Sequence, residues 1–176
     1  MTDAEHTTKP KIILVMGVSG SGKTTIGGML AGRLGREYAE ADDFHPAANL
    51  EKMRSGQPLT DEDRWPWLQR IADWIDERLA SGTPAVVTCS ALKRKYRDVL
   101  RRPGVTVVYL EVDPEVLTRR MAARHGHFFP AKLLESQLKD LEPPAPEEHA
   151  HYVTASGEPP AEIVQRIVDE LHLNAD

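Results

Sequence analysis

The apolar positions of the chain follow two patterns, short continuous runs and longer helical repeats. Continuous runs are typical of strands that are buried on both faces of a sheet. The helical repeats, such as the apolar stripe along residues 67–79, are typical of helices that pack one face against a core. Strand and helix alternate throughout, which predicts an α/β protein with three α/β/α layers around a five-stranded parallel sheet. The expected strands occupy residues 11–16, 37–41, 85–89, 105–112 and 151–154.

Capping residues mark where several of the expected helices begin and end. Thr60 and the acidic residues after it, followed by Pro66, are typical of a helix start. Gly35 and Gly82 stand where helices are expected to stop. The polar segment 42–63 is expected to hold two short helical pieces and to form a working surface. The longer helices are expected at 24–34, 61–81, 93–102, 114–124, 131–141 and 160–171.

Length, charge and cysteine content limit the classes of protein to consider. The 176 residues correspond to one domain, expected over 11–176 after a flexible tail at 1–10. Lysine and arginine number 22 against 27 aspartates and glutamates, a net charge of −5, so no nucleic acid is expected as a partner. No apolar run approaches the ~20 residues of a membrane span, so no membrane association is expected. The single cysteine, Cys89, excludes an intrachain disulfide and, without a signal peptide, favours the cytoplasm.

A glycine-rich motif follows the first strand where a helix is expected to begin. Residues 17–24 read GVSGSGKT and match G-x-x-x-x-G-K-[ST], the P-loop of proteins that bind nucleoside triphosphates. Backbone N–H groups of such a loop surround a polyphosphate, and the helix N-terminus adds its positive end. ATP is the expected nucleotide, with Lys23 as a catalytic cation on the β- and γ-phosphates and Thr24 as a ligand of Mg²⁺. The expected ATP-binding residues are Gly17, Ser19, Gly20, Ser21, Gly22, Lys23, Thr24 and Thr25.

The P-loop alone does not define what receives the phosphate, because motors, switches and kinases share it. A GTPase would need an Asn-Lys-x-Asp motif, but Asn49 and Asn174 are followed by Leu and Ala. A motor ATPase could use the strand that ends in Glu111, although a chain of 176 residues leaves little room for accessory parts. A kinase of a small acceptor is the class that the remaining motifs favour.

Six further motifs carry a specific resemblance. They read DDFHP at 42–46, GQPL at 56–59, DEDRWPWL at 61–68, CSALK at 89–93, YRD at 96–98 and HGHFF at 125–129. Their combination resembles the gluconate kinases of the P-loop class; shikimate kinases and nucleoside monophosphate kinases share the P-loop and general fold without it. The resemblance implies a P-loop NTPase fold like that of the nucleoside monophosphate kinases, with a lid at about 120–132. It also implies a homodimer that uses ATP to phosphorylate D-gluconate to 6-phospho-D-gluconate in carbohydrate catabolism. Another small anionic acceptor, such as a shikimate-like acid or a nucleotide, is the alternative.

Acceptor-binding residues are expected where strands end, because ligands of parallel sheets bind at the carboxyl ends of strands. Asp42 follows the second strand and is the candidate general base. Asp43 beside it could instead be the base, hold a water bound to Mg²⁺, or cap the next helix. His45 is placed to hydrogen-bond a polyol or to stabilise a turn. Arg64 stands at a helix start, where a cation gains nothing from the helix dipole, so it is expected to bind the substrate carboxylate.

Two pairs of basic residues stand four positions apart. Lys93 and Arg97 are expected to face the same anionic substrate pocket, with a solvated helix face as the alternative. Arg120 and Arg124 form a like-charge pair that a bound anion would stabilise, and the ATP phosphates are that anion. The resemblance places this pair in the lid, makes Arg124 catalytic and implies that His127 contacts the substrate.

Overall fold

A five-stranded parallel sheet forms the centre of the protein in the computed structural model, which describes residues 10–18, 20–123 and 131–173. The strand order is β2-β3-β1-β4-β5, so the strand that precedes the P-loop lies in the middle. This confirms the predicted sheet. The strands are β1 (Ile12–Met16), β2 (Glu37–Glu40), β3 (Ala85–Thr88), β4 (Val105–Val112) and β5 (His151–Ala155).

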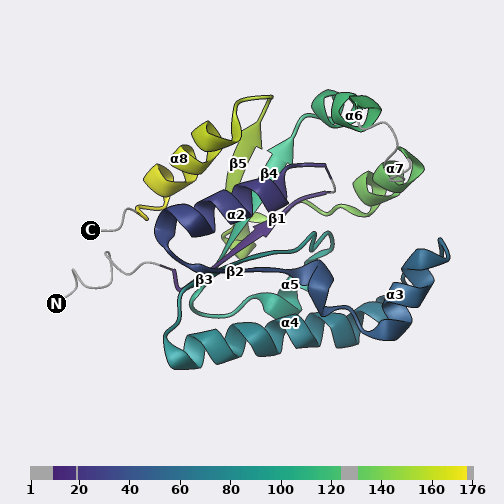
Figure 1. The fold of residues 1–176 in the computed structure, drawn as a ribbon, viewed down its shortest axis with the longest axis horizontal. Helices are drawn as coiled ribbons and strands as arrows, with labels where there is room; N and C mark the ends of the chain where they lie inside the picture. Colours follow the sequence, from purple (N-terminus) through teal and green to yellow (C-terminus); the bar gives the residue numbers. More distant parts are fainter. Residues whose placement is uncertain (1–9, 19, 124–130, 174–176) are drawn as a thin grey trace.

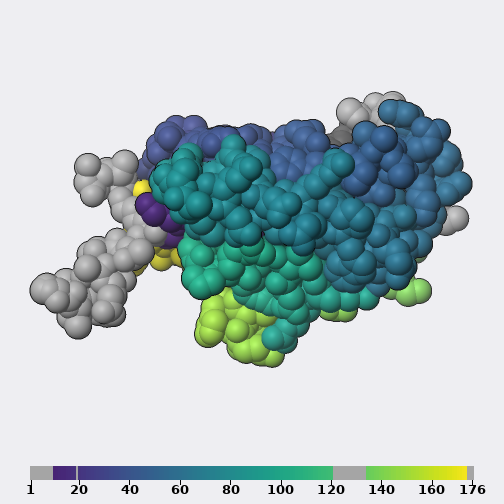
Figure 2. Space-filling model, turned by 90° about the horizontal axis from the view of Figure 1, so that it is seen from below, coloured from purple at the N-terminus to yellow at the C-terminus, as the bar shows by residue number. Residues whose placement is uncertain are grey.

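Helices cover both faces of the sheet, as the alternating pattern predicts (Figure 1). On one face lie α2 (Lys23–Leu34) and α8 (Pro160–Glu170). On the other lie α4 (Asp61–Ser81) and α5 (Arg94–Leu100). Figure 2 looks onto the second face, where the teal atoms of α4 extend across the molecule. The three-layer arrangement is therefore confirmed.

The central strand shows why both layers are needed. All five residues of β1 are buried, and successive side chains point to opposite faces of a strand. Ile12, Leu14 and Met16 pack in the core beneath α4 and α5, whereas Ile13 and Val15 pack in the core beneath α2 and α8. A continuous apolar run therefore requires a helical layer on each face.

The remaining helices lie together at one end of the sheet (Figure 1). After β2 the chain enters the short 3₁₀ helix η1 (Ala41–Phe44) and then α3 (Ala47–Arg54). After β4 it enters α6 (Pro114–Ala123), and α7 (Ala131–Asp140) follows later in the chain. Because β2 and β4 are parallel, η1 and the start of α6 both lie at the carboxyl ends of the strands, where the P-loop also lies.

Local signals define most helix ends. Thr60 caps α4 through a reciprocal pair of hydrogen bonds. The backbone N–H of Asp63 donates to the Thr60 hydroxyl, and the backbone N–H of Thr60 donates to the Asp63 carboxylate. Gly35 and Gly82 end α2 and α4 in the left-handed conformation, as expected. No helix within the described ranges is long and apolar enough to cross a membrane.

Several boundaries differ by one or two residues from the expected ones, and two of these differences concern the site. The second strand ends at Glu40 and not at Ala41, because Ala41 begins the 3₁₀ turn that carries Asp42. The helix expected from residue 93 begins at Arg94, with Lys93 as its extended N-cap residue. Residues 1–9 of the tail expected at 1–10, and residues 124–130 in the middle of the lid expected at about 120–132, lie outside the described residues.

Candidate active site

The P-loop joins β1 to α2 and has the backbone that a phosphate cradle requires. Gly20 and Gly22 have φ values of +85° and +96°, a region that side chains other than glycine rarely adopt. Ser21 lies between them with a buried hydroxyl that has no hydrogen-bond partner among the described residues. A left-handed backbone and an unsatisfied buried hydroxyl suit an anion with many acceptor oxygens, so the loop fits the phosphates of ATP.

Lys23 is the first residue of α2 and is partly buried beside the loop. Burial lowers the pKa of this lysine, and the charges of Asp42 and Glu40 act in the opposite direction. Within the part of the chain that the structure describes, no carboxylate comes within ion-pair distance of its ammonium group. The arrangement leaves a cation free to bind a phosphate.

Thr24 and Glu40 bring two oxygen atoms together at the edge of the cradle. The Thr24 hydroxyl lies 3.5 Å from a carboxylate oxygen of Glu40, the last residue of β2. Hydroxyl and carboxylate oxygens are the ligand type that Mg²⁺ prefers. Among the described residues no cluster of three or more His, Cys, Asp or Glu residues could hold a metal by itself. The sequence analysis missed Glu40, although an acid at a strand end two positions before Asp42 was a usable signal.

A hollow of about 220 Å³ lies between the P-loop, α6 and the beginning of α8. Arg120 of α6 lines it and donates a hydrogen bond of 2.8 Å to the Gly20 carbonyl, so its guanidinium lies beside the P-loop. Glu158 and Pro160, from the start of α8, form the opposite wall. Thr25, expected to bind ATP, is exposed and also lines the hollow.

Asp42 lies in η1 directly after β2, and its carboxylate is exposed. The indole N–H of Trp67 donates a 2.7 Å hydrogen bond to the Ala41 carbonyl, which fixes this turn against α4. The charge of Asp42 acts on the pKa of both Lys23 and His45, which places its carboxylate near the P-loop and the acceptor side at once. Asp43 is not among the charges that act on these two groups. The choice between Asp42 and Asp43 as the base stays a prediction.

His45 is buried between α3 and α4, with only 9% of its surface exposed. Its ring stacks on Trp67 at 4.3 Å between centroids, with an angle of 12° between the planes. Burial lowers the pKa of His45, Asp42 opposes this effect and Arg64 adds to it. His45 is therefore a neutral polar group between a carboxylate and a guanidinium.

Arg64 and Lys93 lie around the ring of Tyr96. The guanidinium of Arg64 lies 5.3 Å from the ring centroid and donates a 3.0 Å hydrogen bond to the Tyr96 oxygen. The ammonium of Lys93 lies 5.9 Å from the same centroid. The Tyr96 hydroxyl donates in turn to Asp61 at 2.5 Å, and Asp61 also pairs with Lys95. Neither Arg64 nor Lys93 forms an ion pair with any carboxylate of the described ranges, so two cations remain available to an anionic ligand.

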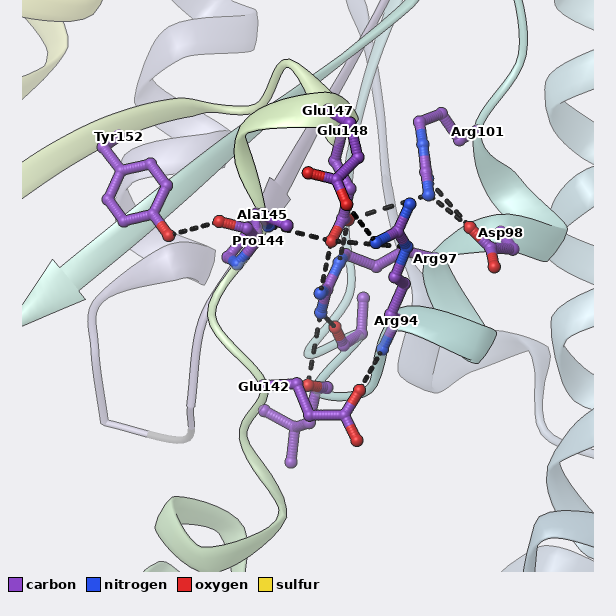
Figure 3. A network of polar contacts seen from close by, with 12 residues as sticks. Arg94, Arg97, Asp98, Arg101, Glu142, Pro144, Ala145, Glu147, Glu148 and Tyr152 are labelled. Atoms are coloured by element: carbon purple, nitrogen blue, oxygen red, sulfur yellow. Dashed lines mark hydrogen bonds and ion pairs between the residues drawn. The ribbon is translucent and has the colours of Figure 1, made fainter.

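Arg97 does not share this pocket, which corrects the expectation that it binds the substrate. Its guanidinium is 1% exposed and donates two hydrogen bonds to Glu148, of 2.7 and 3.1 Å (Figure 3). It also donates to the carbonyls of Ala91 and Leu92 at 2.8 and 3.2 Å. Helical spacing places Lys93 and Arg97 in adjacent turns, but Lys93 is the extended N-cap residue and so does not share the helix face of Arg97. Arg97 is thus a structural residue that fixes the loop before Lys93.

Three expected site residues, Ser19, Arg124 and His127, lie outside the described residues. Their expected roles in binding ATP, in catalysis and in substrate binding stay predictions. Apart from Arg97, the other expected residues lie at one end of the sheet, with the P-loop between the Arg120 side and the Asp42 side.

Comparison with known proteins agrees with this geometry. The family model for shikimate kinase matches residues 19–172. A gluconokinase of Gluconobacter oxydans is 48% identical over 91% of this chain and 92% of its own length. A solved sugar kinase from a Janibacter species is 47% identical with a TM-score of 0.83, and the match covers 93% of this chain and 95% of that one. A gluconokinase structure from Sinorhizobium meliloti is 48% identical with a TM-score of 0.80, covering 93% and 92% of the two chains.

A parallel sheet with a P-loop after its central strand, together with these matches, identifies a P-loop kinase of a small molecule. The matches to the family model and to the curated relatives extend over most of the chain. The chain belongs to the gluconokinase family, within the wider group that the shikimate kinase model describes.

Proposed function

We propose that this protein phosphorylates D-gluconate with ATP, giving ADP and 6-phospho-D-gluconate. The observation that carries the proposal is the pair of cations at Tyr96, Arg64 and Lys93, neither of which forms an ion pair with a described carboxylate. They lie on the acceptor side of the P-loop, where a sugar acid would place its carboxylate. The identity of 48% to a gluconokinase over most of both chains supports the same acceptor.

The reaction needs two substrates in line, and the site provides for both. The P-loop and Lys23 bind the phosphates of ATP, and Arg64 with Lys93 binds the gluconate carboxylate. The 6-hydroxyl then lies toward Asp42, which accepts its proton as the oxygen attacks the γ-phosphorus. The bond to the β-phosphate oxygen breaks and ADP leaves. Positioning and neutralisation of charge carry most of the rate in such a transfer.

Mg²⁺ is part of the proposal. When bound, the ion would neutralise charge on the phosphates of ATP. Thr24 is the residue that would contact it, and Glu40 supplies the neighbouring carboxylate. Arg120 and Arg124 are proposed to contact the ATP phosphates from the other side of the loop, a role that the hydrogen bond of Arg120 to Gly20 supports.

The proposal also covers the oligomeric state of the protein and its location in the cell. The resemblance to gluconate kinases supports a homodimer, which sedimentation would distinguish from a 19.6 kDa monomer. The buried single cysteine suits the reducing cytoplasm, because a buried thiol needs no partner. Nucleic acid and membranes are not proposed as partners.

The experiment that tests the function is a coupled assay of ADP release over a panel of acceptors. The panel contains several sugar acids, shikimate and nucleoside monophosphates, with a control that lacks any acceptor. We expect turnover with gluconate only, well above the control. Equal ATP hydrolysis with and without gluconate would indicate a P-loop ATPase, and turnover with shikimate would reassign the acceptor.

Two neighbouring carboxylates give a matched test of the base. We expect Asp42→Asn to lower kcat strongly and to leave the affinity for ATP nearly unchanged, because this carboxylate acts on the acceptor. Asp43→Asn is the control, with the same change of charge one residue away. If Asp43→Asn is the variant that loses turnover, the base is Asp43.

A further inference from the structure

Asn49 is a buried polar residue for which the proposed reaction has no use. It lies on α3 with 3% of its surface exposed. Its side-chain nitrogen lies 2.9 Å from the backbone oxygen of Asp63 and 3.1 Å from Nδ1 of His45. A buried amide with two partners on different elements has a defined orientation. That orientation bears on which ring nitrogen of His45 carries the proton.

The first partner fixes which end of the amide points where. The backbone oxygen of Asp63 is a carbonyl and can only accept, so the Asn49 atom that faces it must be the nitrogen. The NH₂ group has two hydrogens, and one of them is used by this contact. The second is directed to Nδ1 of His45, and it can form a hydrogen bond only if Nδ1 carries no proton.

We infer that Asn49 is a positioning residue that holds His45 as the neutral tautomer with its proton on Nε2. The inference deepens the proposed function, because it assigns His45 the role of a hydrogen-bond donor in the acceptor site. Stacking on Trp67 fixes the plane of the ring, and the hydrogen bond from Asn49 fixes its rotation. The N–H on Nε2 is then available to an oxygen of the polyol or to Asp42.

The surroundings of His45 favour the same neutral state. Two charged groups act on it, Asp42 from η1 and Arg64 from α4, and their effects oppose each other. Burial disfavours the imidazolium in addition, so the pKa of His45 lies below its ordinary value. The carboxylate of Asp63 is already engaged by Lys52 at 2.6 Å and by the Thr60 N–H, so only its backbone oxygen concerns this network.

This tautomer of His45 gives the histidine and Asp42 different roles in the proposed reaction. A histidine whose Nδ1 is occupied by Asn49 and whose Nε2 is protonated has no free lone pair, so it cannot take the proton of the acceptor hydroxyl. It can donate a hydrogen bond to that hydroxyl and so orient its lone pair toward phosphorus. Proton removal is left to Asp42.

The direct test is a two-bond ¹H–¹⁵N correlation spectrum of the histidine rings in the ¹⁵N-labelled full chain at neutral pH. The signals of His45 are identified by their loss in His45→Gln. We expect an unprotonated Nδ1 and a protonated Nε2 without any substrate. A proton on Nδ1 in the unmodified protein would overturn the inference. The spectrum needs no turnover, so it stands apart from failure of the proposed function.

Asn49→Asp tests the residue itself. A carboxylate at this position accepts from Nδ1–H, so His45 should now carry a proton on Nδ1. We expect KM for gluconate to rise about tenfold with KM for ATP unchanged, the effect of one mispaired hydrogen bond. Gln165→Glu, exposed on α8, adds the same charge as a control and should leave both values unchanged. If the tautomer of His45 is the same in Asn49→Asp, Asn49 does not set it. If that variant does not fold, the spectrum of the unmodified protein decides.

Discussion

Arg64 and Arg97 lie on neighbouring helices, α4 and α5, but their surroundings are opposite. Arg97 is 1% exposed and has both a carboxylate and two carbonyls as partners. Arg64 is partly exposed, and its described partners are the ring and hydroxyl of Tyr96. The difference shows that the function of an arginine depends on whether the protein already supplies its anion.

The free-energy cost of burying a charge explains why the surroundings of Arg97 and Arg64 differ. A guanidinium removed from water must be paired and hydrogen-bonded, or its burial costs several kcal/mol. Glu148 supplies that pairing, and Arg94 and Arg101 approach the same carboxylate at 3.9 and 3.7 Å (Figure 3). Arg64 remains partly exposed to solvent, so its charge costs little folding free energy when no ligand is bound. The first arrangement stabilises the fold, and the second suits a residue that we propose binds the substrate.

The largest expected effect is on stability, from Glu148→Gln. This change leaves Arg97 buried without a counterion and should lower the free energy of unfolding by about 3–5 kcal/mol. Thermal or denaturant unfolding measures it. The double variant Arg97→Met with Glu148→Leu is the control, because an apolar pair of similar volume should recover much of the loss. An unchanged unfolding midpoint with a raised KM for gluconate would place the pair in the acceptor site.

Arg64→Met should lower activity on gluconate and leave the stability of the protein nearly unchanged. Loss of a charge-assisted pair with the substrate carboxylate should reduce kcat/KM for gluconate by about 30- to 150-fold, equal to about 2–3 kcal/mol. The unfolding midpoint should hardly change. Arg54→Met on the exposed side of α3 is the matched control, since Arg54 pairs only with exposed Glu51 among the described residues. If the Arg64 and Arg54 variants have equal activity, Arg64 does not bind the acceptor.

Acid should weaken the pair of Arg97 and Glu148, because it protonates the Glu148 carboxylate. The hydrogen bonds from Arg97 lower the pKa of Glu148 to about 2, below its ordinary value of 4.5. A depressed carboxyl pKa contributes stability that is complete above about pH 4.5 and is lost as the pH falls toward 2. Unfolding measured between these values should therefore show a slope that is smaller in Glu148→Gln. Equal slopes in the two proteins would contradict the pairing.

Local sequence predicted the parts of this structure that depend on neighbouring residues. The buried strands, the P-loop and the glycine helix ends depend on contiguous residues, and all appear where the pattern places them. Arg97 was misassigned because its partner, Glu148, lies 51 positions away along the chain. Helical spacing from Lys93 gave no information about that contact. The sequence assigned no role to Asn49, because its role depends on α3 and α4 packing together.

The central claim is that Arg64 and Lys93 recognise the carboxylate of the acceptor. The most direct measurement compares D-gluconate with D-glucitol, the alditol of the same carbon chain without the carboxylate, by kcat/KM in the unmodified protein and in Arg64→Met. We predict that the unmodified protein strongly prefers gluconate and that the variant loses most of this preference by losing activity on gluconate alone. An equal preference in both proteins would contradict the claim, because the carboxylate would then be recognised elsewhere.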